Sequence, residues 1–481
     1  MRSAKSLAAV LLVCSLAFGL SSCAAPGPPP NIILVSIDTL RADHLGSYGY
    51  ERATSPILDA LAADGVLFET ALAPAPWTFP SHAAMFSGSH PLEIGIDNSL
   101  RTIPDEVPLL AERLAAAGYQ AAAFADSGPR GFVGADRGFG RGFEHYAHAP
   151  HREGLPIRFD IAATVDAALE WLRVDRDPER PFFLFLHTKS VHAVPNDAEC
   201  QDERCFPYDN PHRFRFVESD AAPYAWTSEE KGAGQRYLWS LNAEILEGKL
   251  DPKAYSRQRL DVLKSLYDSG IYYVDQELGR LFDKLREQDL FESTTLVITS
   301  DHGEAFLDHT LFMHQEVYDT QIRIPLIVHA SELKPARKKA PVSLTDIAPT
   351  ILESAGVEVP TSWSGRPLPL GADGVEEEGR DHVAYYLFPS KFTYHSFALR
   401  RGSWKLVFHN VESPETYRYE LYDLANDPYE QRPVVGMDEK VEDMRSALRR
   451  RLQAEPLAQG RQLREHELPE IEAVRALGYV E

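Results

Sequence analysis

The sequence predicts an α/β fold with a mostly parallel central sheet and helices on both faces of that sheet. Three observations carry this prediction: strand-like and helix-like segments alternate, the strand-like segments are almost continuously apolar, and an acidic residue follows two of them. Continuous apolar runs are typical of strands that are buried on both faces of a parallel sheet. Ligands bind such sheets at the carboxyl ends of the strands, so Asp38 and Asp301 are candidates for a functional site.

The predicted elements follow one another in the order that such a fold requires. A buried strand at 31–38 comes first. A helix then begins at Ser55, an N-cap residue with a proline after it, and ends at Gly65. The further elements predicted here are a helix that ends at Gly118, strands at 120–125, 182–187 and 294–300, an amphipathic helix at 161–174 and a long helix at 258–288.

A change of pattern near residue 375 predicts a smaller C-terminal unit, an antiparallel sheet with a packing helix. We therefore divide the chain into an α/β domain at 31–374 and an α+β subdomain at 375–481. Within the first domain, residues 195–255 interrupt the alternation and are predicted to form an insertion over one edge of the sheet. The C-terminal elements are strands at 382–388, 396–400, 404–408 and 419–422 and a helix at 438–452.

The first 22 residues are typical of an export signal: two cations precede an apolar run at 7–20, which is too short to span a bilayer comfortably. The run ends in Leu-Ser-Ser-Cys, which resembles the lipobox of bacterial lipoproteins and implies that Cys23 is acylated. The alternative is an ordinary signal peptide with an incidental cysteine. We expect an exported lipoprotein on the periplasmic face of the outer membrane or on the cell surface, joined to the membrane only by the lipid on Cys23 through a proline-rich tether at 23–30.

Two cysteines remain beyond the signal and the lipid attachment site, Cys200 and Cys205. In an oxidising compartment this pair can close a small disulfide loop, which we favour over a zinc site because no other cysteine lies nearby.

The composition excludes some classes of function. A hydrophobic content of 44% with 10% aromatic residues rules out a mainly disordered chain. Lys and Arg number 49 against 71 Asp and Glu, a net charge of −22, which disfavours nucleic acid as a partner. An anionic substrate would therefore need a local positive centre such as a metal ion.

Several segments together resemble the sulfatase branch of the alkaline phosphatase superfamily, over nearly the whole length after residue 30. The resemblance implies an alkaline phosphatase-like fold and an anionic ester as substrate. Its segments are NIILVSIDTLRADHLGSYGY from residue 31, PWTFPSHAAMFSGSHPLEIGI from 76, SLYDSGIYYVDQELGRLFDKL from 265, LVITSDHGEAF from 296, SWKLVFHN from 403 and YELYDLANDPYE from 419.

The resemblance also implies one divalent metal ion. Asp38 matches the family's first carboxylate ligand, Asp301 and His302 match the second pair, and Thr78 stands at the position of the nucleophile. Two carboxylates, an imidazole and a hydroxyl oxygen suit a divalent cation, which activates the hydroxyl and offsets charge on the transferred group.

The chain departs from the sulfatase pattern at four points. Sulfatases use a Cys or Ser that is converted to formylglycine, but oxidation of Thr78 would give a ketone, and His82 replaces the arginine of that motif. Thr39 replaces a second aspartate of the metal loop, which favours Zn or Mn over Ca or Mg. The sulfatase Lys-X-His signature is absent at 126–128. The set instead resembles the single-metal phosphotransferases of the superfamily.

Further polar residues are candidates for the pocket. His192 and His314 resemble histidines that bind a non-bridging oxygen or protonate the leaving group. His82 is either a third catalytic histidine or a residue that serves the helix dipole or cap. Asn98 matches in spacing an asparagine that binds the transferred group, although a turn-forming role is equally compatible. Two more histidines receive structural roles: His187 and His309.

Three functions follow. The leading one is a metal-dependent hydrolase, or a phosphotransferase, in which Thr78 attacks the phosphorus of a phosphate or phosphonate ester. The second is sulfate ester hydrolysis without formylglycine. The third is a catalytically silent lipoprotein that binds an anion. The sequence leaves open the leaving group, the acceptor and the oligomeric state.

Overall fold

The computed structural model describes residues 28–96, 102–126, 131–148, 160–192, 210–212, 214–217, 234–371, 379–387, 394–411 and 418–453. The predicted signal peptide, most of the predicted insertion, and four residues named above lie outside these ranges: Cys23, Asn98, Cys200 and Cys205.

An eight-stranded sheet forms the centre of the molecule, in the order β12-β2-β11-β7-β1-β6-β4-β5. The five strands from β7 to β5 are mutually parallel, whereas β11 runs antiparallel to both of its neighbours. The predicted, mostly parallel sheet is therefore confirmed. Its strands are β1 (Asn31–Ile37), β2 (Val66–Phe68), β4 (Gln120–Ala125), β5 (His145–His148), β6 (Phe182–Thr188), β7 (Thr294–Thr299), β11 (Leu326–His329) and β12 (Ala336–Lys338).

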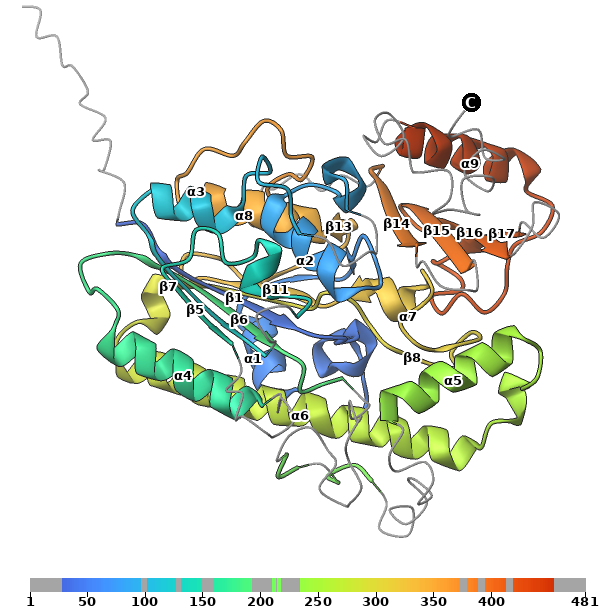
Figure 1. Cartoon of the computed structure of the whole chain (residues 1–481), viewed down its shortest axis with the longest axis horizontal. Coiled ribbons are helices and arrows are strands. Elements are labelled where there is room, and N and C mark those ends of the chain that lie inside the picture. Colours follow the sequence, from blue (N-terminus) through green and yellow to red (C-terminus); the bar gives the residue numbers. More distant parts are fainter. Residues whose placement is uncertain are drawn as a thin grey trace, which may run out of the picture.

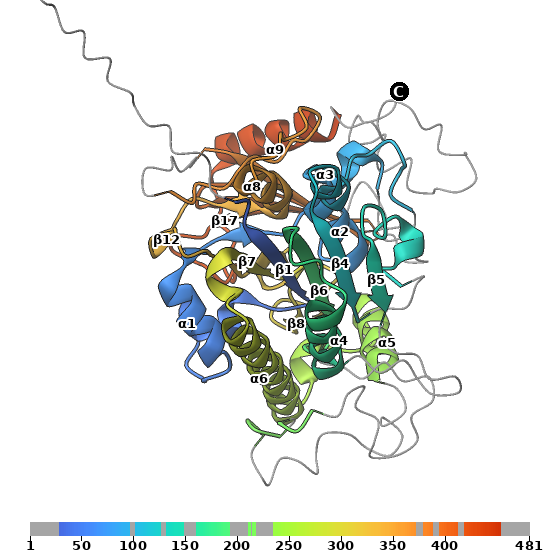
Figure 2. The same cartoon turned by 90° about the vertical axis from the view of Figure 1, so that its left-hand side faces the viewer.

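Helices cover both faces of this sheet (Figures 1 and 2). Successive side chains of a strand point to opposite faces, and in β1 this sends Ile32 and Leu34 into one hydrophobic cluster and Ile33 and Val35 into the other. The continuous apolar run of β1 follows from this double burial. One face carries α2 (Thr78–Ser87), α3 (Leu110–Ala116) and α8 (Ile347–Ser354), and the other carries α1 (Pro56–Asp64), α4 (Ile161–Val174) and α6 (Arg257–Glu287).

The C-terminal part forms the predicted antiparallel sheet with a helix against it (Figure 1). Phe397 and Leu399 pack with Met444 and Leu448 of the helix in a separate hydrophobic cluster. Most of these strands extend one to three residues beyond the predicted ends, because pairing continues through polar residues that the apolar pattern does not mark. The elements are β14 (Asp381–Leu387), β15 (Tyr394–Arg401), β16 (Trp404–Val411), β17 (Arg418–Asp423) and α9 (Asp438–Gln453).

Short elements border the carboxyl ends of the central strands. Helix α5 (Gly234–Leu246), which lies in the described part of the predicted insertion, packs against β9. None of the helices in the described part of the chain has both the length and the apolarity that a bilayer span requires. The short elements are β3 (Ala71–Leu72), β8 (Ala305–Phe306), β9 (Phe312–Met313), α7 (Asp319–Ile322), β10 (Arg323–Ile324) and β13 (Val342–Ser343).

The predicted cap of α1 is wrong in one respect. Ser55 occupies the N-cap position, but its hydroxyl donates to the Asp59 carboxylate at 3.1 Å and accepts no hydrogen bond from the helix amides. The carboxylate of Asp275, from α6, accepts instead from the amides of Ile57 at 3.1 Å and Leu58 at 2.8 Å. A tertiary contact therefore replaces the local cap.

Candidate active site

Four predicted residues meet at the carboxyl edge of the central sheet. Asp38 directly follows β1, Asp301 and His302 follow the neighbouring β7, and Thr78 begins α2. The Nε2 atom of His302 lies 3.8 Å from Asp38 Oδ1, 3.5 Å from Asp301 Oδ2 and 3.3 Å from Thr78 Oγ1. At most 5% of any of the four residues is exposed. The parallel register of β1 and β7 brings together groups that are about 260 residues apart.

The carboxylates of this group are suited to a cation. Among the described residues, neither oxygen of Asp38 has a hydrogen-bond partner, and the same is true of Asp301 Oδ2. Asp301 Oδ1 accepts from the amides of Thr39 at 3.2 Å and His302 at 2.9 Å. Burial of unpaired carboxylates is costly unless a counter-charge lies between them. The first cluster, Asp38, Asp301 and His302, therefore fits a divalent metal ion, with the Thr78 hydroxyl beside it.

The residue after Asp38 connects the two strand ends. Thr39 has a φ of 60°, which is unfavourable for a β-branched residue and marks local strain. The Thr39 amide donates to Asp301 and the Thr39 hydroxyl donates to the Asp38 carbonyl at 2.7 Å, while the Tyr267 hydroxyl donates to the Thr39 carbonyl at 2.6 Å. The Thr39 hydroxyl is thus engaged by the backbone and does not take the place of the aspartate that sulfatases usually carry here.

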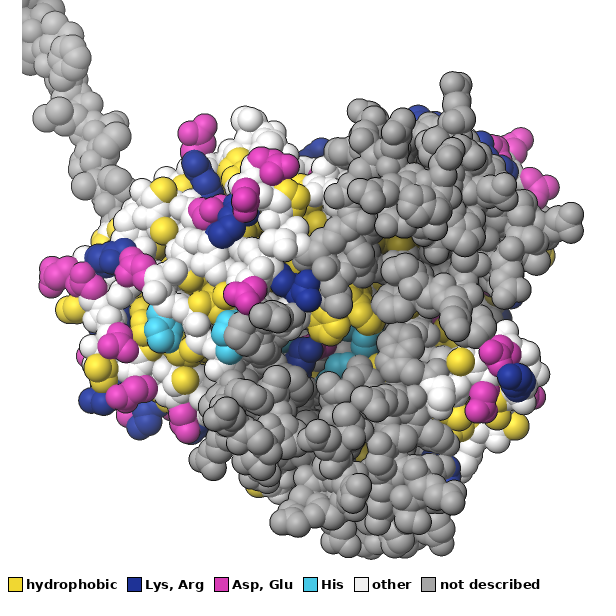
Figure 3. Space-filling model, viewed as in Figure 1, with side chains coloured by type: hydrophobic (Ala, Val, Ile, Leu, Met, Phe, Trp, Pro, Cys, Tyr) yellow, Lys and Arg dark blue, Asp and Glu magenta, His cyan; other side chains and the backbone are white. Residues whose placement is uncertain are grey.

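A second cluster adjoins the first and consists of His192, Glu304 and His314. Glu304 Oε1 lies 3.2 Å from His314 Nδ1, and Glu304 Oε2 lies 3.5 Å from His192 Nδ1. The rings of His302 and His314 have centroids 4.5 Å apart, so the two clusters are in direct contact. Figure 3 shows histidine side chains beside Lys or Arg and hydrophobic side chains near the middle of one face of the molecule.

His82 is buried within α2, under Thr78. Its Nδ1 lies 2.8 Å from the Thr78 carbonyl and its Nε2 lies 2.9 Å from Ser36 Oγ, on β1. Its Nδ1 is also 3.6 Å from Asp301 Oδ2. This geometry favours the structural alternative for His82, since the ring joins the start of α2 to the sheet and thereby fixes Thr78. The predicted catalytic role stays a prediction.

Two side chains near the site were given no functional role from the sequence. His187, near the end of β6, has its Nε2 3.9 Å from Asp38 Oδ2, and Lys189 Nζ lies 3.8 Å from the same oxygen. Asp126 holds this segment through bonds from Thr188 Oγ1 at 2.6 Å and the Lys189 amide at 3.0 Å. Lys189 therefore places a cation beside Asp38, and Asp126 fixes the Lys189 backbone.

Burial sets the protonation of the surrounding histidines. It lowers the pKa of His82 and of His192 to about 4, and it lowers the pKa values of His187 and His314 well below the usual value. These rings are neutral near pH 7, which is the form that binds metals. Burial also raises the pKa of Glu304 to about 7, although His192 acts in the opposite direction.

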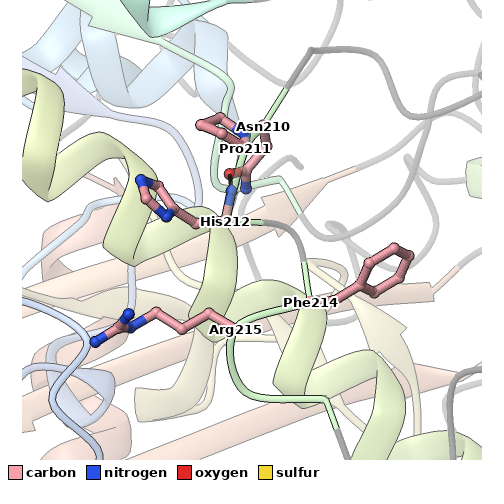
Figure 4. Close-up of a pocket in the computed structure, with 5 residues that line it drawn as sticks. All are labelled: Asn210, Pro211, His212, Phe214 and Arg215. Carbon is pink, nitrogen blue, oxygen red and sulfur yellow. Dashed lines mark hydrogen bonds between the residues drawn. The ribbon is translucent and has the colours of Figure 1, made fainter. Parts of the chain in front are cut away.

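A separate cavity of about 590 Å³ lies against α6. In Figure 4 the His212 and Arg215 side chains extend to one side, and Phe214 points away from them. None of its described lining residues belongs to either cluster, so the cavity is not the candidate active site. The lining residues are Asn210, Pro211, His212, Phe214 and Arg215.

The family model for sulfatases matches residues 30–357, more than half of the chain and both clusters. The chain belongs to the sulfatase family. A second model, the C-terminal region of N-sulphoglucosamine sulphohydrolase, matches residues 307–457, including the described antiparallel sheet. The resemblance found from the motifs is thus confirmed, and with it an enzyme that hydrolyses ester bonds. Sulfatases generally use a divalent metal, for which the first cluster offers ligands.

Individual relatives are distant. The chain is 26% identical to the ulvan-active sulfatase of Formosa agariphila over 421 residues, which cover 85% of this chain and 78% of that one. It is 25% identical to the N-acetylglucosamine-6-O-sulfatase of Bacteroides thetaiotaomicron, with 90% of this chain and 88% of that one covered.

Solved structures share the fold. One is the structure of a protein in complex with its substrate, D-glucosamine-2-N,6-O-disulfate. It aligns at a TM-score of 0.65 and 20% identity, covering 88% of this chain and 97% of that one. Another is the phosphonate monoester hydrolase of Agrobacterium radiobacter, at a TM-score of 0.65 and 19% identity, covering 88% and 95%. These two structures therefore resemble this chain equally well in fold.

Proposed function

We propose that this sulfatase-family enzyme hydrolyses an anionic phosphate or phosphonate ester with Thr78 as its nucleophile. The observation that carries the proposal is the Thr78 hydroxyl, which lies 3.3 Å from His302 Nε2 beside two buried carboxylates. Threonine cannot yield the aldehyde on which ordinary sulfatase chemistry depends, whereas a threonine alkoxide can attack phosphorus directly.

Asp38, Asp301 and His302 are the residues that would hold a divalent cation, for which we favour Zn or Mn. Such a cation lowers the pKa of a hydroxyl that it touches and offsets charge on the transferred group. The position of Thr78 supports this role, because Thr78 is the first residue of a ten-residue helix whose N-terminus favours negative charge.

The reaction then has two steps, transfer of the phosphoryl group to Thr78 and its transfer to water. After loss of its proton to solvent, Thr78 Oγ1 forms a bond to phosphorus, and the bond from phosphorus to the leaving oxygen breaks. Lys189 binds a charged oxygen of the group, and a proton from solvent reaches the leaving oxygen. Water then attacks phosphorus and releases Thr78.

The Thr78→Ala variant tests this proposal, with Thr78→Ser as the matched control. We expect the alanine variant to lose on the order of 10³-fold or more in kcat on an aryl phosphate or phosphonate monoester, and the serine variant to keep most of it. The metal content should stay unchanged in both, because the carboxylates and the imidazole remain. Equal activity of wild type and alanine variant would rule out Thr78 as nucleophile.

Sulfate ester hydrolysis is the second candidate, favoured by the names of the sequence relatives. The same assay decides between them. A higher kcat/KM for an aryl sulfate than for the matching phosphate and phosphonate would establish the second candidate. We also propose that the enzyme is exported and lipid-anchored at Cys23.

A further inference from the structure

The second cluster is assembled from three separate segments of the chain. His192 follows β6, Glu304 immediately precedes β8, and His314 immediately follows β9. One ligand-capable atom from each lies within 4.8 Å of the others. None of these residues belongs to the first cluster.

Glu304, whose carboxylate lies between the two histidines, provides the main evidence for a ligand site. Glu304 is 1% exposed, and its Oε2 atom has no hydrogen-bond partner among the described residues, while Oε1 lies 3.2 Å from His314 Nδ1. Two histidines that only contacted an oxyanion would not need a buried anion between them. Two imidazoles and one carboxylate are instead a common ligand set of catalytic zinc sites, where a further position stays open.

The surrounding structure holds the ligands in place. Met313 has a φ of 68°, an uncommon conformation for a residue other than glycine, and it sets the direction of the next residue, His314. Asn242 of α5 binds both the amide and the carbonyl of Phe312 at 2.9 Å. Arg41 donates to the Glu304 carbonyl at 3.0 Å. Such outer contacts fix metal ligands before an ion arrives.

We propose that His192, Glu304 and His314 bind a second divalent ion of the zinc type, next to the ion of the first cluster. Two imidazoles favour a transition metal over Ca or Mg. Two adjacent ions can stabilise the attacking and the leaving oxygen of one displacement. That role depends on the proposed phosphoryl transfer, whereas the binding of the ion does not.

Metal stoichiometry tests the proposal. Metal-free protein is titrated with Zn²⁺ alone, and the bound ion is measured after desalting by elemental analysis. We expect two equivalents in wild type and one in Glu304→Gln. Glu316→Gln, a substitution of a buried glutamate in the same region but outside the cluster, should keep two. One equivalent in wild type, retained by Glu304→Gln, would overturn the second site.

Two further variants test the second metal site independently of Glu304→Gln. His192→Ala removes another ligand and should also leave one equivalent, so a folding defect of one variant does not decide the outcome. Thr78→Ala should keep two equivalents. If it also keeps full activity, the proposed nucleophile is wrong and the second metal site still stands.

Discussion

The molecule contains two buried groups of acidic side chains that are balanced in different ways. At the contact between α7 and the C-terminal sheet, Lys405 Nζ lies 2.7 Å from Asp319 Oδ1 and 2.6 Å from Glu430 Oε1, and Arg400 lies 2.8 Å from Asp319 Oδ2. We call these four residues the junction cluster. At the strand ends, by contrast, Asp38, Asp301 and Glu304 lie among neutral histidines, with Lys189 as the nearby cation.

This difference indicates which group is structural and which is functional. In the junction cluster two cations meet two acids, and, against the effect of burial, Lys405 and Arg400 lower the pKa of Asp319 to about 2. Lys405 and Arg400 thus balance the acids of the junction cluster without an external ion, and these ion pairs join the C-terminal sheet to the main domain. The candidate active site keeps more carboxylates than cations among its described residues, so it needs ions from outside.

The largest expected effect comes from the first cluster. In Asp38→Asn one ligand is lost, and we expect activity to fall on the order of 10³-fold because the nucleophile loses its activation. In wild type, Zn²⁺ at 1,000 times the Kd of the first cluster should raise the free energy of unfolding by about 4 kcal/mol through that cluster, and in the variant this part of the gain should vanish. Activity assays and urea unfolding with and without metal measure both effects. Equal stability of metal-free and metal-loaded wild type would contradict the claim that the active-site carboxylates need an external ion.

The junction cluster should respond differently. Lys405→Met leaves two buried acids without their shared cation, which should cost about 3–5 kcal/mol of unfolding free energy, with or without metal. Lys284→Met, at an exposed pair with Glu287, is the control and should change little. The zinc stoichiometry of folded Lys405→Met should equal that of wild type. A loss that appeared only in the metal-free protein would show that the junction cluster is coupled to the site.

The sequence predicted those parts of the site that local pattern encodes. Asp38 and Asp301 each follow a continuous apolar strand, and the parallel fold then requires their strand ends to be neighbours. His187 lies near Asp38 because β6 pairs with β1, whereas the contacts of Glu304 and Lys189 depend on how separate loops pack at that edge. In the segment 301–304 the sequence pointed to Asp301 and His302 as metal ligands, but it gave no reason to single out Glu304.

The junction cluster was not predictable for the same reason. Asp319 and Lys405 are 86 residues apart, and no periodicity of either segment relates them. Ser55 was correctly predicted at the N-cap position of α1, but the acceptor for the Leu58 amide was not predictable, because Asp275 lies 217 residues away in a different helix. Sequence pattern therefore yields the elements and their order, and three-dimensional packing decides which polar groups meet.

The smallest predicted effect concerns Asp275, a buried acid that is balanced by backbone amides and not by a cation. Burial raises the pKa of this carboxyl to about 7, although the amides of Leu58 and Ile57 act to lower it. An unfolded aspartate titrates near 3.9, so between about pH 4 and pH 7 the folded state binds more protons than the unfolded state. The contribution of Asp275 to stability must therefore decline as pH rises through that window, by at most about 1.4 kcal/mol per pH unit, and level off above pH 7.

The Asp275→Asn variant removes this titration and keeps an acceptor for the helix amides. Urea unfolding of the two metal-free proteins at pH 5, 6, 7 and 8 should show the variant gaining on wild type as pH rises, by about 2 kcal/mol in total. The exposed Asp166→Asn is the control and should show no such trend. A difference that stayed constant with pH would mean that the helix amides hold Asp275 ionised throughout. Backbone dipoles would then balance the charge of a buried acid without a cation. Asp38, Asp301 and Glu304 would be the acids in this comparison that the described residues balance incompletely.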